Sequence, residues 1–188
     1  MKKIFILAAG CAFVFACNNE KKEDDKKMDD TNKTTMSSGD KKAATELLDV
    51  SMGDGVKSSF TAFSKGDIDG MTANYADNIL YAWSNGDSLN GKKAVADYYK
   101  GRWKLLESLN FDNYIVLPLQ VNEPQIPALQ KGKWVLHWAT AKAKYKNGKT
   151  VDFFLHSVNH MNDAGKVDFI RMYYDRHPIM EATKDLMK

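Results

Sequence analysis

The sequence predicts an α+β domain in which helices gather on one face of a bent antiparallel sheet. Three observations support this class. Helical periodicity of apolar residues comes first in the globular part, strand-like segments dominate its second half, and the last strands are joined by short turn signals. With 188 residues, 44% of them hydrophobic, the chain can bury one core of ordinary size.

The first 16 residues are typical of an export signal. Lys2 and Lys3 precede an apolar stretch over 4–16, which is too short to span a bilayer because a spanning helix takes about 20 apolar residues. The run that ends at Cys17 resembles a bacterial lipobox, in which the cysteine sulfur receives a lipid. Cys11 is a second candidate, and an ordinary secretory signal with two incidental cysteines is the other alternative. We expect an exported protein held to the outer membrane, at its periplasmic or surface face, through acylated Cys17.

Residues 17–42 are predicted to form a disordered tether, because their charged and polar composition buries too little surface to offset the ordering entropy. The cluster Lys22-Glu23-Asp24-Asp25 resembles the acidic export signals of surface lipoproteins in the Bacteroidetes, and a solvated spacer of mixed charge is the alternative. No cysteine follows Cys17, which excludes a disulfide or a cysteine-bound metal in the domain.

The charge balance argues against a nucleic-acid partner. The chain has 27 Lys and Arg against 24 Asp and Glu, and removing Lys2 and Lys3 with the signal leaves 25 against 24. Neutralising several phosphates requires a clustered basic excess, and this balance offers none.

Two helical segments and a strand open the domain. The segment 43–65 carries apolar residues at helical spacing and ends at Gly66, although two glycines weaken its middle. Asp67 is expected to cap a short helix, and 79–83 reads as a strand. Asn90-Gly91 opens a second long helix, whose apolar face is Val95, Tyr98, Tyr99, Trp103 and Leu106.

Strands dominate from residue 111 onward. The expected strands cover 111–121, 133–145, 150–161 and 166–176, with a loop over 122–131 that contains Pro124 and Pro127. Asn147-Gly148 is a strong signal for a hairpin turn, and 162–165 forms the next turn.

The turns also predict which side chains face the helices. A two-residue turn at Asn147-Gly148 pairs Lys146 with Lys149 and places Trp138 opposite Ser157. Pairing Met161 with Lys166 places Ser157 opposite Ile170. The face predicted to meet the helices carries Trp134, Leu136, Trp138, Thr140, Phe153, Leu155, Ser157, Ile170, Met172 and Tyr174.

The opposite face, here called the outer face, is expected to carry polar and apolar residues together, among them His137, Phe154, His156, Val158, His160, Phe169, Arg171, Tyr173 and Asp175. Such a surface is either solvated or shared with a second subunit. The apolar members of the set favour a homodimer through this face as a hypothesis.

Several short motifs occur together along the domain: Ala62 to Met71, Tyr75 to Ile79, Asn90 to Val95, Gly165 to Val167, and Tyr174-Asp175. In this order and spacing they resemble the nuclear transport factor 2-like superfamily, which has a cystatin-like arrangement, and within it the SnoaL-like proteins. The resemblance covers about 45–178 and implies a bent sheet wrapped on helices, with a pocket at the wide end of the cone. The expected organisation is a signal peptide over 1–16, a lipidated cysteine and tether over 17–42, the domain over 43–178 and a tail over 179–188.

The resemblance does not carry one activity with it, since the superfamily includes isomerases, cyclases, dehydratases, epoxide hydrolases and binding proteins without catalysis. Its ketosteroid isomerases use a carboxylate base and two proton donors; the base position falls on Trp83, the acid donor on Ser157 and the tyrosine donor near Ser59. Because base and acid are missing, such an isomerase is not expected. A lyase, cyclase or hydrolase that uses His156 and Asp175 is the alternative, and it requires the opposite assignment of faces.

We therefore expect an envelope lipoprotein that binds a small apolar or aromatic ligand without catalysis and without a cofactor. The residues expected to line its pocket are Ser59, Trp83, Tyr99, Trp103, Trp134, Trp138, Thr140, Phe153, Ser157, Met172 and Tyr174. No metal is expected; the alternative is a zinc or copper site formed by His137, His156 and His160 on one face. A dimeric interaction module of an envelope complex is the third reading.

Overall fold

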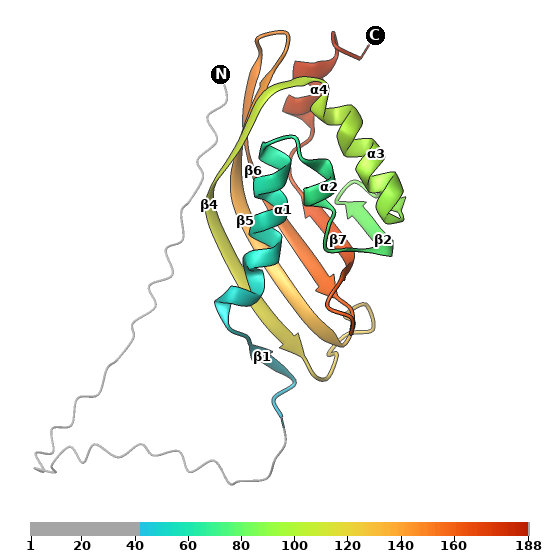
Figure 1. Cartoon of the computed structure of the whole chain (residues 1–188). Coiled ribbons are helices and arrows are strands. Elements are labelled where there is room, and N and C mark those ends of the chain that lie inside the picture. Colours follow the sequence, from blue (N-terminus) through green and yellow to red (C-terminus); the bar gives the residue numbers. More distant parts are fainter. Residues whose placement is uncertain (1–41, 188) are drawn as a thin grey trace, which may run out of the picture. The chain divides into compact units, whose positions relative to one another are not determined.

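The computed structural model describes residues 42–187, and the predicted signal peptide, Cys17 and most of the tether lie outside the described residues. Seven strands form one sheet in the order β1-β4-β5-β6-β7-β2-β3. All neighbours are antiparallel except β2 and β7, which run parallel. Helices α1, α2 and α3 cover one face of this curved sheet (Figure 1), which confirms the predicted α+β class.

The elements follow one another as a helical layer and then a meander. The strands are β1 (Thr45–Leu47), β2 (Tyr75–Trp83), β3 (Ser88–Asn90), β4 (Leu106–Val121), β5 (Gly132–Tyr145), β6 (Thr150–Met161) and β7 (Val167–Tyr173). The helices are η1 (Val50–Gly53, a 3₁₀ turn), α1 (Asp54–Ser64), α2 (Ile68–Met71), α3 (Lys92–Trp103) and α4 (His177–Thr183). No helix within 42–187 is long and apolar enough to cross a membrane.

The first predicted helix is shorter than expected. Residues 45–47 instead pair with the end of β4, where Thr45 lies opposite Val121. Gly53 lies where the chain passes close to β4, since an added Cβ would be 2.8 Å from Val116 Cγ2. The chain passes this point in the 3₁₀ turn η1, and α1 begins at Asp54.

Helix α1 ends at Ser64 with Lys65 as its C-cap, and the predicted stop, Gly66, follows directly. This residue has φ of 76°, a left-handed conformation that favours glycine. The side chain of Asp67 accepts a 2.7 Å hydrogen bond from the Gly70 amide, which confirms the predicted cap of α2.

Two other boundaries differ from the predictions. Leu106, assigned to the second long helix, begins β4 and pairs with Tyr145. The predicted tail over 179–188 includes most of α4, whose Ile179 and Ala182 are buried in a second apolar cluster with Leu109. The folded unit therefore continues past residue 178.

The β5–β6 hairpin corrects the predicted register by one residue. Lys144 pairs with Thr150, and the Tyr145 amide donates to the Lys149 carbonyl, so the loop is the three residues Lys146–Gly148. Gly148 takes a φ of 83° at its last position, as three-residue hairpin loops require. Because side chains alternate along a strand, this single-residue shift inverts the predicted faces of β5.

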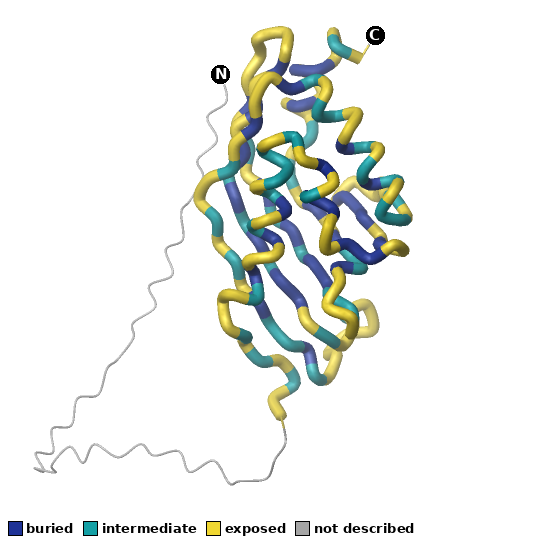
Figure 2. The backbone as a smooth tube through the Cα atoms, in the orientation of Figure 1, coloured by how far each residue is buried: buried dark blue, intermediate teal, exposed yellow. Residues whose placement is uncertain are grey.

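The inversion moves small and polar residues of β5 inward. His137, Ala139, Ala141 and Ala143 are buried, while Leu136, Trp138 and Thr140 lie on the outer face (Figure 2 shows the buried positions along the central strands). Trp134 also shares the outer face, where it packs against His160 with ring centroids 4.9 Å apart.

The β6–β7 register also differs, but by two residues. Ser157 lies opposite Met172 rather than Ile170. An even shift preserves the faces, so Leu155, Ser157, Ile170 and Met172 face the helices as predicted.

Candidate ligand-binding site

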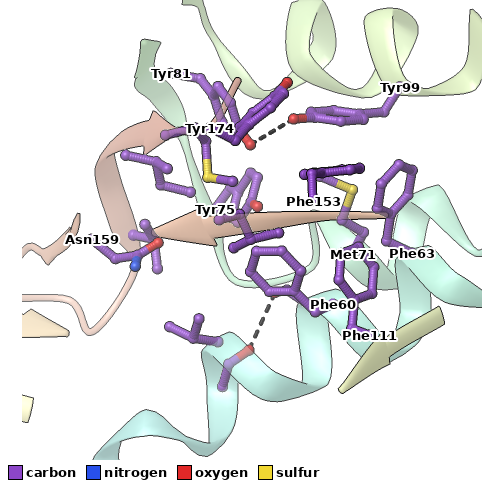
Figure 3. A pocket seen from close by; sticks show the side chains of 17 residues that line it. Phe60, Phe63, Met71, Tyr75, Tyr81, Tyr99, Phe111, Phe153, Asn159 and Tyr174 are labelled. Atoms are coloured by element: carbon purple, nitrogen blue, oxygen red, sulfur yellow. Dashed lines mark hydrogen bonds between the residues drawn. The ribbon is translucent and has the colours of Figure 1, made fainter. Parts of the chain in front are cut away.

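A cavity of about 80 Å³ lies between the helical layer and the inner face of the sheet (Figure 3). Its walls come from α1, α2, α3 and strands β2, β4, β6 and β7. Most of the lining is apolar, with Phe60, Phe63, Met71, Phe111, Phe153 and Leu155 among its members. The polar groups are few: Ser59, Asn159 and the four tyrosines Tyr75, Tyr81, Tyr99 and Tyr174.

Two of the tyrosines are bonded to each other. The hydroxyls of Tyr81 on β2 and Tyr99 on α3 lie 2.6 Å apart. Burial raises the pKa of both phenols well above the usual value of 10, and it also raises the pKa of Tyr75. Burial raises the pKa of Tyr174 to about 12. The hydroxyls that border this cavity are therefore protonated at neutral pH and can donate hydrogen bonds.

Asn159 is held in one orientation at another part of the wall. Its Nδ2 donates to the Val135 carbonyl and to Ser157 Oγ, each at 3.0 Å. Both N–H groups are thus used, and the carboxamide oxygen accepts no hydrogen bond from residues 42–187. In Figure 3 this oxygen points toward the cavity.

Behind this wall lies a buried histidine. His137 is 0% exposed, its Nδ1 is 3.4 Å from Ser157 Oγ, and its Nε2 has no partner among the described residues. Phe60 covers the imidazole, with ring centroids 4.4 Å apart. Burial, with smaller effects of His156 and Lys57, lowers the pKa of His137 from 6.5 to about 4, so its ring is neutral at pH 7.

Five of the residues expected to line a pocket border this cavity: Ser59, Tyr99, Phe153, Met172 and Tyr174. Trp134, Trp138 and Thr140 do not, because the register of β5 places them on the outer face. Trp83, Trp103 and Ser157 are on the inner side but behind the wall; Trp83, for example, packs against Tyr81 with ring centroids 5.0 Å apart.

The expected set omitted several lining residues that carry signals in the sequence. Phe60 and Phe63 lie on the apolar face of the predicted first helix. Tyr81 is two residues before Trp83 on the same strand, so both side chains lie on one face of the sheet. Asn159 is two residues after Ser157 on the same strand and shares its face, and Ser157 was predicted to face inward. Its polar side chain gave no reason to place it at an apolar cavity.

The alternative catalytic pair is absent from the cavity. His156 lies on the outer face, stacked between Trp138 and Tyr173 with ring centroids 4.6 and 5.6 Å away. Asp175 follows the end of β7 and accepts a hydrogen bond from the His177 amide. The geometry of the described residues therefore offers no His–Asp pair to a ligand in this cavity.

The three histidines of the alternative metal site do not share one face. His137 faces the helices, whereas His156 and His160 lie on the outer side, where His160 Nδ1 is 2.6 Å from Asp168 Oδ1. Within the described part of the chain, no group of three metal-ligating side chains comes together. The one-residue change of register is again the cause.

A family model described as a SnoaL-like domain matches residues 56–169, which is more than half of the chain. The chain belongs to the SnoaL-like domain family. No curated protein matches its sequence. The SnoaL-like fold explains why the bent sheet, the helical layer and the cavity between them occur together here.

Solved structures share this fold at low identity. A candidate isomerase from Bacillus subtilis has 17% identity and a TM-score of 0.55, with 70% of this chain and 91% of that chain covered. A candidate polyketide cyclase from Pseudomonas putida has 16% identity and a TM-score of 0.56, with 69% and 96% covered. TerC, crystallised with polyporic acid, has 14% identity and a TM-score of 0.53, with 71% and 98% covered. At these identities the likeness concerns the fold.

Proposed function

We propose that this SnoaL-like domain binds a small neutral ligand of apolar or aromatic character in the cavity, without catalysing a reaction. The observation that carries the proposal is the lining itself. None of the described residues that border the cavity is a carboxylate, a histidine or a lysine, and the tyrosines have raised pKa values. A general base near neutral pH is therefore lacking, whereas an apolar wall with a few oriented polar groups suits binding. TerC, a protein of the same fold, was crystallised with an organic compound, polyporic acid.

The size of the cavity limits the ligand. About 80 Å³ holds several waters, while an apolar cavity of about 150 Å³ is known to admit benzene. A single-ring ligand would therefore have to displace the half-buried ring of Phe60 or Phe63 as it enters.

Filling part of the cavity should weaken binding. Ser59→Leu adds an apolar side chain at the lining, and we expect it to lower the affinity for ethylbenzene at least about tenfold, as measured by calorimetry or by ligand-observed NMR. Ser58→Leu changes the exposed neighbour on the same helix and should leave the affinity unchanged. Equal binding by the two variants, or no binding by the unmodified domain, would exclude this cavity as the site.

We also propose that the protein is a lipoprotein anchored through Cys17. The support is the sequence pattern at the export signal. Cys17→Ala should move the protein from the membrane pellet to the soluble fraction of cells, whereas Cys11→Ala should leave it in the pellet. If Cys11→Ala alone released it, the lipid would be on Cys11; if neither change did, the anchor would be refuted.

A separate observation favours a role in protein–protein association. The outer face of β4–β7 exposes Phe154 at 82% and Ile115 at 62%, beside the stacked rings of Trp138, His156 and Tyr173. We propose a second copy of this chain as the occupant. The same face carries both Arg171 and Asp152, so a copy related by a two-fold axis can offer each charge its opposite.

A charge on that face should prevent association. We expect Phe154→Asp to convert a dimer to a monomer in sedimentation velocity, while Met180→Asp, at an exposed position on α4, should keep the dimer. A monomeric mass for the unmodified chain would refute the homodimer.

A further inference from the structure

Of the polar groups that border or adjoin the cavity, three are held in place by their neighbours: the carboxamide of Asn159, the bonded pair of Tyr81 and Tyr99, and the imidazole of His137, which Phe60 covers. The first two are part of the lining itself, at different edges of the cavity (Figure 3). Their hydrogen-bonding capacities can be counted, and the count indicates which ligand chemistry they match.

Asn159 can only accept a hydrogen bond from a ligand. The Val135 carbonyl can only accept a hydrogen bond, so the amide nitrogen of Asn159 must face it. This contact assigns the positions of Nδ2 and Oδ1 in the carboxamide. The second N–H is used by Ser157 Oγ. The free Oδ1 is therefore a fixed acceptor at an otherwise apolar wall, and burying it against an apolar group would leave it without a partner.

The tyrosine pair has one free proton to donate. Two neutral phenols have two protons, and the 2.6 Å contact between their oxygens uses one of them. The other proton has no acceptor among the described residues, and burial keeps both phenols protonated. The hydroxyl that receives the shared hydrogen bond is also the stronger donor, because hydrogen bonds in a chain polarise one another.

We propose that the ligand is a neutral single-ring compound that carries a hydroxyl at one end and a carbonyl at the other. Its hydroxyl donates to Asn159 Oδ1, and its carbonyl accepts from the Tyr81–Tyr99 pair. This inference rests on the proposed binding function of the same cavity and adds the polarity of the ligand. The inferred ligand is not an anion, because the lining offers no positive group to balance its charge and the free Asn159 oxygen would repel it.

Four ligands of nearly equal size test the proposal. Ethylbenzene has neither group, acetophenone has the carbonyl, 4-ethylphenol has the hydroxyl, and 4-hydroxyacetophenone has both. The full-length chain carrying Cys17→Ala avoids detergent, which would compete for apolar ligands. We expect each group to raise the affinity about fivefold, so 4-hydroxyacetophenone should bind about 25-fold more tightly than ethylbenzene.

Two variants assign each group to its partner. Asn159→Leu should abolish the advantage of 4-hydroxyacetophenone over acetophenone and keep its advantage over 4-ethylphenol. The double change Tyr81→Phe and Tyr99→Phe should do the reverse, and removing both hydroxyls together avoids leaving one of them unpaired. Retained binding of ethylbenzene shows that each variant still forms the cavity.

The outcomes separate this inference from the proposed function. If the unmodified chain binds none of the four ligands, the binding function fails. If it binds all four with equal affinity, the cavity binds apolar ligands and the inferred polarity is wrong. If both variants reduce both advantages equally, the assignment of the groups to Asn159 and to the tyrosines is overturned.

Discussion

Replacing Gly66 with alanine should lower the free energy of unfolding by about 2–5 kcal/mol. The left-handed backbone at this residue costs a side-chain-bearing residue about 1–2 kcal/mol. In addition, the new Cβ would lie 2.5 Å from Nε1 of Trp103, and overpacking of this kind costs about 1–3 kcal/mol. Trp103 packs against Phe63 with ring centroids 5.9 Å apart, so moving it disturbs the helical wall of the cavity.

Gly165 provides the matched control. Its φ is 71°, yet nothing lies within 4 Å of an added Cβ. Gly165→Ala should therefore cost only the backbone part, about 1–2 kcal/mol. Urea unfolding followed by circular dichroism measures both variants, and equal losses would show that Trp103 gives way freely and that no steric cost exists at Gly66.

Acidification should destabilise the protein through His137. Its pKa is about 4 in the folded state, lowered from 6.5 chiefly by burial, so between these values the unfolded chain binds a proton that the folded chain does not. The stabilisation is complete above about pH 6.5 and is lost as the pH falls toward 4. For a shift of this size the loss is about 3 kcal/mol in total.

His137→Leu should flatten this part of the stability profile, because it removes the titrating group. The measurement is the free energy of unfolding at several pH values from 7 to 4, with the difference in slope between the unmodified protein and the variant as the readout. His177→Gln, which changes an exposed histidine, should keep the original slope. A variant profile parallel to that of the unmodified protein would contradict the buried, neutral state of His137.

The order of the long helices and strands could be predicted from the sequence because it depends on local signals, whereas the short elements β1, β3 and α4 were not predicted. The cap at Asp67, the left-handed glycine at Gly66 and the turn at 162–165 are all decided by residues next to them. The faces of β6 and β7 were also predicted correctly despite a wrong register, because a shift by two residues leaves the alternation unchanged.

The faces of β5 could not be predicted in this way, since Asn147-Gly148 fits both a two-residue and a three-residue loop. Hydrophobicity then favoured Trp138 as the inward residue. In the fold, the small Ala139 and Ala141 are inside, where they leave room for the large rings of α1, and the tryptophan lies outside. Three of the eleven expected pocket residues, Trp134, Trp138 and Thr140, were misplaced for this one reason.

The parallel pairing of β2 with β7 has a consequence for the kinetics of folding. Tyr81 pairs with Ile170 and Trp83 with Met172, so residues from the two ends of the domain must meet before this part of the sheet exists. Contacts of such long sequence separation slow folding, because the chain loses conformational entropy in closing the loop before any stabilising contact forms. Both β2 and β7 supply walls of the cavity. A ligand can therefore be enclosed only after the last strand has docked, and nascent chains that end before β7 should remain unable to bind it.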